Sequence, residues 1–445
     1  MHQFFSRRLK QPIAVLCSAA LLLTTFALPA TADEGMWTYF NLPTKQLKEK
    51  YNFEATQEWL DHLRLSSVRF NDGGSGSFIS PSLVITNHHV ASGQLQKIST
   101  PKKDYLKDGF LARNQAEEIK CADLELNVLM SMEDVTARIN GAVKAEMNPQ
   151  QAAAARRDEI NKIQKESTDK TSLRSDVVSF YQGSEFWLYR YKKYTDVRIV
   201  FAPEKQAAFF GGDPDNFTYP RFDLDVTVMR VYENGKPVAS PHHLKWNSNS
   251  ANENDLTFVS GHPGSTQRTF TMAQMEYQRD VRYPAVLNIL KQQLKAMYDY
   301  AALGAEQKRQ AEEGIFGFEN TQKAYIGQYQ GLLDKNIMAK KQQEENDLRA
   351  KVEADPELKK SYGSAWEEIA QAQAEIAKLI KPIRYRNIVN STLLGLASGI
   401  ATYIKEVKKP DAERDTGYHD AELESTKLQL FSPAPTYPAL EEKTI

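Results

Sequence analysis

The sequence predicts an α+β protein in which a β-rich first part precedes a long helical region. Residues 66–130 carry short apolar runs separated by glycine and proline, a pattern typical of strands and hairpins. From about residue 275 the apolar spacing becomes helical, and the composition shifts to Gln, Glu, Lys and Ala. A length of 445 residues is more than one ordinary domain needs, so we expect separate β-rich and helical units.

The N-terminal segment has the pattern of a secretory signal. Basic residues at positions 7–10 precede an apolar run over 13–28, and residues 30–32 fit the small-x-small cleavage pattern. We therefore expect residues 1–32 to be a signal peptide, with Asp33 as the mature start. An uncleaved membrane anchor is the alternative, and the polar residues inside the apolar run disfavour it. A periplasmic or secreted protein without membrane attachment after cleavage follows.

Charge and cysteine usage exclude several classes of function. The net charge is −1, or about −4 without the three basic residues of the signal, and no basic patch interleaves with aromatics. We therefore expect no nucleic-acid partner. No His-Glu-x-x-His or similar ligand spacing occurs, so we expect neither metal nor cofactor. Cys121 alone remains after the signal, which predicts a buried apolar thiol and no internal disulfide.

The first elements after the signal are a helix and a hairpin. Apolar positions across 33–65 predict an amphipathic helix on the domain surface. Strands are expected at 77–79 and 83–86 around a Ser-Pro-Ser turn, and a half-buried strand is expected at 121–130. Two histidines, His88 and His89, follow the second strand of the hairpin. A histidine just past a strand end is held by the rigid strand and is open to a cleft, which suits a general base. An isolated histidine at such a position is nevertheless usually an ordinary loop residue.

The middle of the chain predicts one helix, several strands and one structured loop. Asn148 caps a helix that should run over 149–168 as a solvated excursion. Strand character returns at 186–191 and 197–201, followed by a loop at 209–221 that is rich in Gly, Pro, acids and aromatics. The strand at 225–232 opens on Asp225, and an Asp there is most often a cap or a turn residue.

The last part of the chain predicts helices and then an irregular end. A strand into a tight turn is expected at 256–264, where His262 stabilises the turn, and His242 and His243 should lie at the surface. Helical spacing then continues to about residue 408. Asp355 and the proline after it begin a helix that carries an apolar stripe through residue 380. Residues 410–445 read as irregular and proline-rich.

The hairpin and its histidines resemble the histidine segment of chymotrypsin-like serine peptidases. The shared order is Gly-Ser-Gly, strand, turn, strand, Thr-x-x-His-Val, and it aligns His89 with the catalytic base. In the same families an Asp at the head of a strand is the acid of the triad, a position that Asp225 occupies, with Asp223 as the fallback. The resemblance implies that the carboxylate orients the imidazole while the imidazole takes a proton from a serine.

A narrower resemblance, to the bacterial dipeptidyl-peptidase 7 and dipeptidyl-peptidase 11 family, runs over the mature chain. It implies a double β-barrel of chymotrypsin type with a helical cap, and release of dipeptides from peptides with a free N-terminus. It also implies that Asn216, Phe217 and Asn320 bind the substrate around its α-amino group. The residues that carry it are Asp33-Glu34-Gly35-Met36-Trp37, Thr86-Asn87-His88-His89, Phe209-Phe210-Gly211-Gly212-Asp213, Asp215-Asn216-Phe217, Pro220-Arg221, Asp225 with its strand, and Gly261-His262-Pro263-Gly264.

The resemblance also implies a division into domains. Residues 33–274 would be the first barrel with the base and the acid, 275–430 the helical cap, and 431–445 a connection towards a second barrel. The family's serine motif, Gly-Asn-Ser-Gly-Ser-Pro, does not occur, and neither does Gly-x-Ser-x-Gly. We therefore expect the nucleophile to lie outside this chain and the chain alone to be inactive.

Two alternatives and one partner remain open from the sequence. A periplasmic Deg-type endopeptidase shares the Gly-Ser-Gly and Thr-Asn-x-His-Val string, but the long helical region argues against it. A non-catalytic peptide-binding fragment is the second alternative, since no nucleophile is identified. A homodimer is also possible.

Overall fold

The computed structural model describes residues 35–71, 73–264, 266–386, 391–415, 417–420, 422–432 and 435–445. The expected signal peptide, residues 1–32, lies outside the described residues. The chain divides into two compact units. In the described residues, the smaller unit comprises 35–54 and 247–259, and the larger comprises 55–246 with the described part of 260–445.

The smaller unit contains one short helix, α2 (Thr44–Tyr51). Asn52 ends it in the left-handed conformation, with φ 50°, and its N–H bonds to the carbonyl oxygen of Lys48. The rings of Phe53 and Phe258 lie 5.1 Å apart. The single helix predicted over 33–65 is therefore wrong. The left-handed residue breaks it, and a new helix begins only after Thr56, whose side chain accepts a hydrogen bond from the Trp59 N–H.

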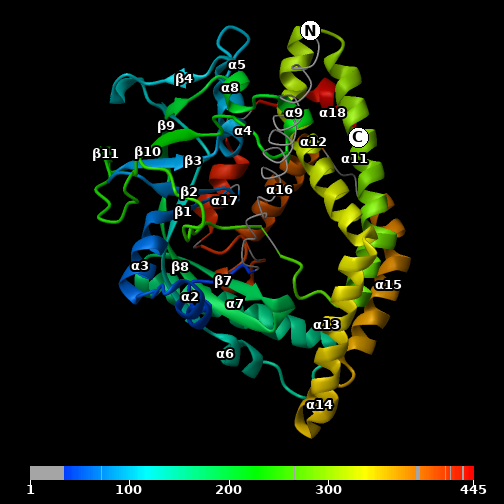
Figure 1. Ribbon diagram of the computed structural model, residues 1–445. Helices are drawn as coiled ribbons and strands as arrows, with labels where there is room; N and C mark the ends of the chain where they lie inside the picture. Colours follow the sequence, from blue (N-terminus) through cyan, green and yellow to red (C-terminus); the bar gives the residue numbers. More distant parts are fainter. Residues whose placement is uncertain are drawn as a thin grey trace, which may run out of the picture. The chain divides into compact units, whose positions relative to one another are not determined.

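Strands of the larger unit form one sheet, in which neighbouring strands pair antiparallel (Figure 1). Its described strands are β1 (Ser67–Phe70), β2 (Ser75–Phe78), β3 (Leu83–Thr86), β4 (Phe110–Leu111), β5 (Ile119–Lys120), β6 (Leu126–Asp134), β7 (Arg174–Phe180), β8 (Glu185–Tyr194), β9 (Asp196–Ala202), β10 (Thr227–Glu233) and β11 (Lys236–Pro237).

The order of the sheet is β4-β9-β10-β3-β2-β1-β6-β8-β7, with β11 on β10 and β5 on β9. The expected hairpin is confirmed as β2 and β3, which pair Phe78 with Val84. The strands expected at 186–191 and 197–201 are confirmed as β8 and β9. The two end strands do not pair with each other in the described part of the chain. The sheet is therefore open, and the barrel and double-barrel details are not confirmed.

Eight helices of the described residues precede the long helical region, α2 among them. The other seven are α3 (Gln57–Ser66), α4 (His88–Ile98), α5 (Tyr105–Asp108), α6 (Thr136–Gly141), α7 (Pro149–Thr171), α8 (Lys205–Ala208) and α9 (Gly212–Asp215) among the described residues. The predicted cap of α7 is confirmed, because the Asn148 side chain accepts from the Gln151 N–H and Gln151 returns a bond. The expected solvated helix also buries one face, through Ile163.

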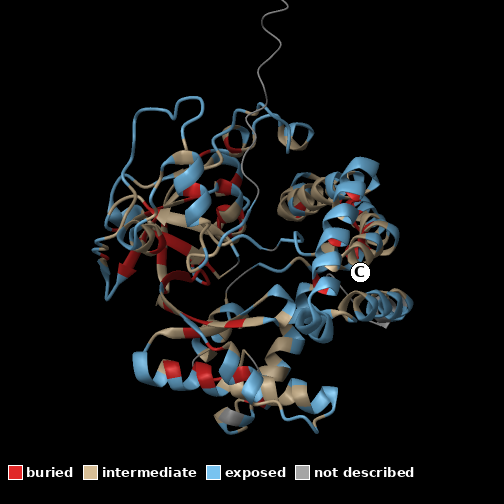
Figure 2. Ribbon diagram, turned by 60° about the horizontal axis from the view of Figure 1, so that its bottom comes forward, coloured by how far each residue is buried: buried red, intermediate tan, exposed pale blue. Residues whose placement is uncertain are grey.

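Two apolar clusters hold the sheet, and the buried residues gather in its strands (Figure 2). The larger lies under β1–β3, β9 and β10 and includes Cys121, which is fully buried as predicted. The smaller packs α6 and α7 against β8. The strand expected at 121–130 begins only at Leu126. Its first four residues are all buried, not alternating, so both faces of the sheet are covered at this point.

The chain from 256 to 264 forms no strand in its described residues, which corrects the expectation. The side chain of Phe258 makes a ring contact with Phe53, and none of the described strands pairs with this segment. His262 anchors the following turn through its backbone N–H, which donates to Oγ of Ser75 at 2.7 Å.

The predicted helical region is confirmed. Its described helices are α10 (Met272–Tyr277), α11 (Tyr283–Ala301), α12 (Ala305–Leu333), α13 (Lys335–Ala354), α14 (Pro356–Tyr362), α15 (Ala365–Arg386), α16 (Thr392–Glu406), α17 (Leu423–Leu430) and α18 (Pro438–Thr444). Asp355 caps α14 as predicted, but α14 ends at Tyr362 and the apolar stripe belongs to α15. The end predicted as irregular instead contains α17 and α18.

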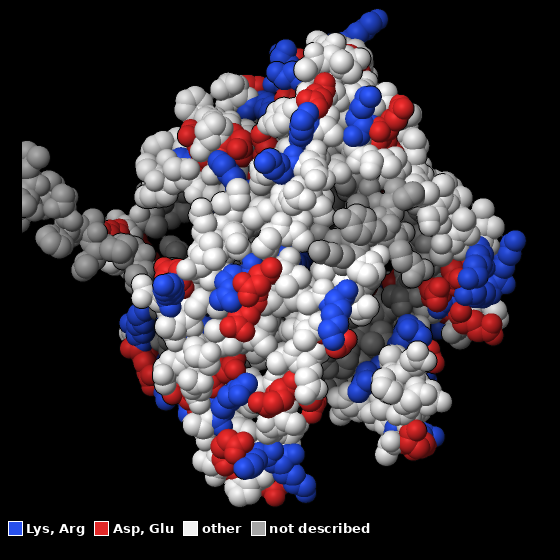
Figure 3. All heavy atoms as spheres, turned by 90° about the vertical axis from the view of Figure 1, so that its right-hand side faces the viewer, with Lys and Arg blue, Asp and Glu red and all other residues white. Residues whose placement is uncertain are grey.

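Helices α11 and α12 lie side by side, and α12 also packs against α4 and α9 (Figure 1). Acidic and basic side chains are interspersed over the face in Figure 3, without an extended area of one sign. Ion pairs such as Lys295–Asp299 on α11, with Nζ and Oδ2 2.5 Å apart, are exposed and contribute only tenths of a kcal/mol each, roughly. Of the described helices, none has the length and apolar character needed to cross a membrane.

Candidate active site

The hairpin positions His89 at the start of a helix. Strand β3 ends at Thr86, whose hydroxyl donates to the Ser75 carbonyl on β2 at 2.7 Å. Asn87 is extended, with φ −74° and ψ 150°, and α4 begins at His88. The turn from strand to helix leaves the imidazole of His89 half-exposed at the edge of the sheet.

Pairing of β3 with β10 brings Asp225 to His89. Thr227 lies opposite Thr86 in the antiparallel register, so the residues just outside both strands meet. His89 Nδ1 and Asp225 Oδ2 are 2.7 Å apart, and the His89 backbone N–H donates to Oδ1 at 2.9 Å. The amide Nδ2 of Asn87 donates to the Oδ2 atom at 3.1 Å. The two residues that the sequence separates by 136 positions therefore form one hydrogen-bonded unit.

This contact fixes the tautomer of the imidazole. Because an ionised carboxylate only accepts hydrogen bonds, Nδ1 carries the proton, and the lone pair of the neutral ring lies on Nε2. No group of the described residues hydrogen-bonds to Nε2. The bond to Asp225 raises the pKa of His89 above its usual value, against the opposing effect of burial. For Asp225, burial opposes ionisation, but the hydrogen bonds from His89 outweigh it and lower the pKa.

The neighbouring candidates have other surroundings. His88 is buried, and burial lowers its pKa, which keeps the ring neutral; its Nε2 has no partner in the described structure. Asp223, the fallback acid, pairs with Arg221, with Nε and Oδ2 3.0 Å apart. No contact joins Asp223 to the imidazole of His89 within the described residues. The geometry therefore singles out His89 and Asp225.

A cavity of about 290 Å³ adjoins this pair. Its lining includes all five residues that the sequence predicts for the site, namely His89, Asn216, Phe217, Asp225 and Asn320. The apolar part of the wall comes from Leu106, Ala208, Phe209 and Phe316. The cavity therefore lies between the ends of the sheet strands, the loop at 209–221 and the helix α12.

Asn216 and Asn320 meet across this cavity. Nδ2 of Asn216 donates to Oδ1 of Asn320 at 3.0 Å, which joins the loop to α12 over 104 positions. Arg221 donates from Nη1 to Oδ1 of Asn216, also at 3.0 Å. Phe217 has a positive φ of 60° and is 66% exposed, so its ring stands out of the loop beside Asn216.

Acidic groups outnumber basic ones in the lining. Lys205 pairs with Glu312, Arg221 with Asp223, and His89 with Asp225. Glu313 lacks an ion pair in the described part of the chain. Burial raises its pKa, and the carboxyl contacts the Ser92 hydroxyl at 2.8 Å. The cavity is therefore suited to a cationic group such as an ammonium.

Sequence reasoning assigned no role to Arg221 and Glu313, which line the cavity, or to Lys323 of α12. Lys323 donates to the backbone carbonyls of Asp213 and Asn216, which fixes the loop to α12. One signal was available, because positions 313, 316 and 320 share one face of a helix, where charged and polar residues interrupt an apolar pattern. The described residues hold no cluster of three or more His, Cys, Asp and Glu side chains that could bind a metal.

The curated proteins that resemble this chain include several named as dipeptidyl-peptidases. The chain is 34% identical to a dipeptidyl-peptidase 7 of Capnocytophaga gingivalis over 301 residues, which is 62% of this chain and 42% of that protein. It is 28% identical to an Asp/Glu-specific dipeptidyl-peptidase of Shewanella putrefaciens over 427 residues, or 91% and 57% of the two chains. The chain spans about half the length of the curated relatives it matches.

Solved structures give the same fold. Porphyromonas endodontalis DPP11 in complex with the dipeptide Arg-Asp matches with a TM-score of 0.71 and 22% identity, over 90% of this chain and 59% of that one. The same protein with the dipeptide Arg-Glu matches with a TM-score of 0.69. The peptidase S46 family matches residues 32–445, which is nearly the whole sequence. The chain therefore belongs to the peptidase S46 family.

Proposed function

We propose that this chain is part of a serine-type dipeptidyl-peptidase that releases dipeptides from the free N-terminus of peptides. The observation that carries the proposal is the 2.7 Å contact between His89 Nδ1 and Asp225 Oδ2, with Nε2 left free at the cavity. The names of the curated relatives, dipeptidyl-peptidase 7 and Asp/Glu-specific dipeptidyl-peptidase, support the same reaction class.

In the proposed reaction, Nε2 of His89 takes the proton of a serine hydroxyl as the oxygen attacks the second peptide bond. The resulting imidazolium is stabilised by Asp225 and then gives the proton to the leaving amine. Water hydrolyses the acyl-enzyme by the same path and releases the dipeptide. We propose that the serine lies outside these 445 residues, because the family's Gly-Asn-Ser-Gly-Ser-Pro motif does not occur in them. The chain alone is then inactive.

Recognition of the free N-terminus is assigned to Asn216, Phe217 and Asn320. Amide oxygens can accept from an α-ammonium, and acidic side chains outnumber basic ones in the lining of the same cavity. An acyl group on that nitrogen removes its charge and adds bulk in a closed space. The proposal therefore requires that acylated peptides bind poorly, which distinguishes an exopeptidase from a Deg-type endopeptidase.

The proposal also covers the division into domains, the secretion of the protein and its oligomeric state. Residues 33–274 belong to the first barrel of a double barrel, residues 275–430 to the helical cap, and 431–445 to the connection towards the second barrel. Residues 1–32 direct the protein to the periplasm or the medium. A homodimer also stays a prediction, which the molar mass in solution would test by light scattering.

The test uses the protein as the organism makes it, with dipeptidyl chromogenic substrates that carry a free or an acetylated N-terminus. We expect cleavage of the free substrate, loss of cleavage after acetylation, and loss of activity in His89→Ala. Equal cleavage of both substrates, or degradation of casein, would favour an endopeptidase. Tight binding of a dipeptide without any cleavage would favour a non-catalytic peptide-binding protein.

A further inference from the structure

Arg221 donates to the side-chain amide of Asn216, one of the two amides that meet at the cavity. Its side chain is only 15% exposed, and its guanidinium lies 4.6 Å above the ring of Phe209. The Phe209 ring in turn meets Phe316 of α12 edge-on, with centroids 4.9 Å apart. The Arg221–Asp223 ion pair neutralises the charge of the guanidinium. Burial and stacking restrict the guanidinium, and its hydrogen bond to Asn216 is made by Nη1, while Nε and Nη2 have no hydrogen-bond partner in the described structure.

The guanidinium determines which end of the Asn216 amide faces it. Arginine carries donors and no acceptor, so the atom 3.0 Å from Nη1 has to be the oxygen Oδ1. The nitrogen Nδ2 then lies on the other branch of the amide, where it donates to Oδ1 of Asn320. The hydrogen bonds therefore run in one direction, from the Arg221 donor to Asn216 and from Asn216 to Asn320. Only one orientation of each amide satisfies both bonds.

The side-chain oxygens of Asn216 and Asn320 each accept one of these hydrogen bonds, which uses one of the two lone pairs on each oxygen. One lone pair therefore remains on Asn216 and one on Asn320, at the wall of the cavity. An ammonium presents three donors and no acceptor, so two amide oxygens in the lining of one cavity match it. Reversed amides would instead present N–H groups and repel the same ligand.

We propose that Arg221 is a positioning residue that orients the amides of Asn216 and Asn320, so that both oxygens accept from the substrate α-ammonium. The inference rests on the proposed function for the identity of the ligand. Arg221 acts through the amides, and the ion pair with Asp223 cancels the repulsion that its charge would exert on an ammonium.

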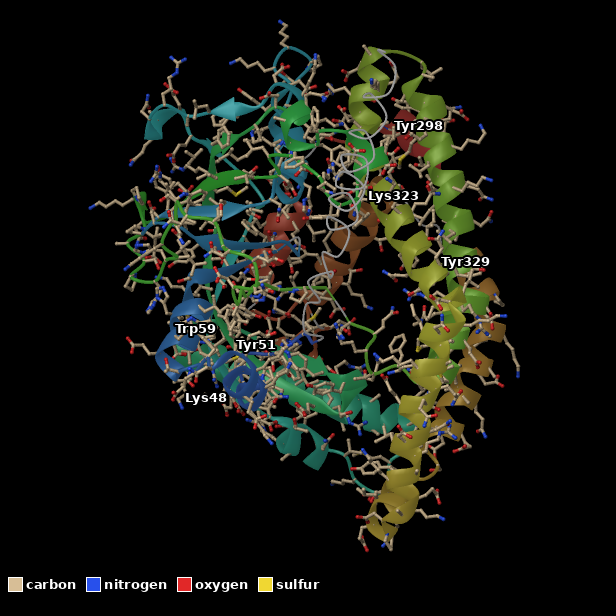
Figure 4. The ribbon with its side chains drawn as sticks, viewed as in Figure 1. Lys48, Tyr51, Trp59, Tyr298, Lys323 and Tyr329 are labelled. Atoms are coloured by element: carbon tan, nitrogen blue, oxygen red, sulfur yellow. The ribbon has the colours of Figure 1, made fainter. Side chains whose placement is uncertain are left out.

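A second attachment makes the proposal testable without loss of the loop. Lys323 reaches from α12 to α9 (Figure 4), where it binds the carbonyl of Asp213 and, at 3.4 Å, that of Asn216. Nζ also lies 3.6 Å from Oδ2 of Asp213. Because these contacts do not involve Arg221, the loop stays fixed to α12 when the guanidinium is removed.

Three variants separate orientation from charge and packing. Arg221→Met removes the donor and keeps an apolar stem over Phe209, whereas Arg221→Lys keeps a donor. Arg198→Met is the matched control, since Arg198 also pairs with an aspartate and lies 3.9 Å above a ring, that of Tyr232, outside the cavity. In the protein as made, kcat/KM for the free dipeptidyl substrate should fall at least about 10-fold in Arg221→Met, mainly through KM, recover in part in Arg221→Lys, and stay unchanged in Arg198→Met.

The side-chain amide resonances of the ¹⁵N-asparagine-labelled chain give a readout that needs no activity. Arg221→Met should shift and broaden the Nδ2 pairs of Asn216 and Asn320, while Arg221→Lys and Arg198→Met keep them. Unchanged resonances in a folded Arg221→Met, or equal losses in the Met and Lys variants, would overturn the proposal. Failure of the wild-type protein to discriminate free from acetylated substrate would instead overturn the proposed function.

A pair of isosteric variants tests the same polarity if Arg221→Met does not fold. Aspartate only accepts, so Asn320→Asp can keep the bond from Asn216, whereas Asn216→Asp cannot donate to Asn320. Asn216→Asp should therefore lose at least about 10-fold more kcat/KM than Asn320→Asp. Equal losses, or the opposite order, would show that the amides do not have this orientation.

Discussion

The base–acid pair and the amide pair are built in opposite ways within one cavity. His89 and Asp225 flank adjacent strands, so the backbone register of β3 and β10 determines their approach. Asn216 and Asn320 come from a loop and from α12, and side-chain contacts alone join them. Under the proposed function, the sheet would hold the catalytic pair rigidly, while recognition would depend on how the helix and the loop are held together.

The largest effect is expected at the acid. Asp225→Asn can accept from Nδ1–H only with the amide oxygen and can favour the wrong tautomer, a change that costs about 10⁴-fold in kcat in a Ser-His-Asp protease. We expect a loss of this order in the protein as made, measured with a dipeptidyl chromogenic substrate. Asp223→Asn is the companion variant, and we expect it to raise KM instead, through Arg221. An equal fall of kcat in both variants would remove the distinction between the two pairs.

The sheet side should also be the acid-sensitive side in stability. Burial, and then the nearby charge of Arg69, lower the pKa of His262 to about 4 from 6.5. Between these two values the unfolded chain binds the proton and the folded chain does not. The free energy of unfolding therefore decreases as the pH is lowered from 6.5 to about 4, by up to about 3 kcal/mol. Urea titrations at about pH 7 and pH 4.5 measure the fall, and His262→Gln should reduce it. An identical fall in the variant would contradict this assignment.

The helix side should affect affinity more than turnover. Asn320→Ala removes an acceptor and leaves Asn216 Nδ2 without its partner, so KM for the free-amine substrate should rise about 10-fold or more, with a small change in kcat. Steady-state kinetics separate the two constants. A fall in kcat with KM unchanged would place Asn320 with the chemistry and undo the comparison.

The smallest effect is expected far from both pairs. The Asp355 carboxylate accepts from the backbone N–H groups of Glu357 and Leu358 at the start of α14. Asp355→Ala should lower the free energy of unfolding by about 1 kcal/mol and leave kcat and KM unchanged. Urea unfolding and steady-state kinetics check both statements, and a raised KM would mean that the helical region transmits strain to α12.

Sequence patterns predict the sheet side of the site well, for a physical reason. A hairpin, its turn and a strand that begins at an aspartate are local sequence signals. The alternation of buried and exposed residues then predicts where these strands lie in the sequence. His89 and Asp225 could be named because the resemblance and the strand ends agree. The open sheet could not be derived, since closure depends on which distant strands pair.

The part of the site formed by α12 and the loop at 209–221 is harder to predict from the sequence. Asn320 was named only through resemblance. Nothing local to Lys323 indicates that it meets Asp213, 110 positions away, and nothing in the pattern around Arg221 indicates that it donates to the Asn216 amide. Short helices such as α17 and α18 were also missed, because proline and a polar composition argue for irregular chain while tertiary contacts stabilise the helices. Contacts between distant helices are set by packing and not by propensity.

The most direct test of the account is an NMR titration of the His89 imidazole in the 445-residue chain, with Asp225→Asn as the companion. We predict that His89 carries a hydrogen-bonded Nδ1 proton far downfield and titrates above 6.5, because the Asp225 carboxylate raises its pKa, and that the variant loses both properties. An imidazole that titrates at its ordinary value in both proteins, without the downfield proton, would contradict the base–acid pair and the peptidase proposal with it.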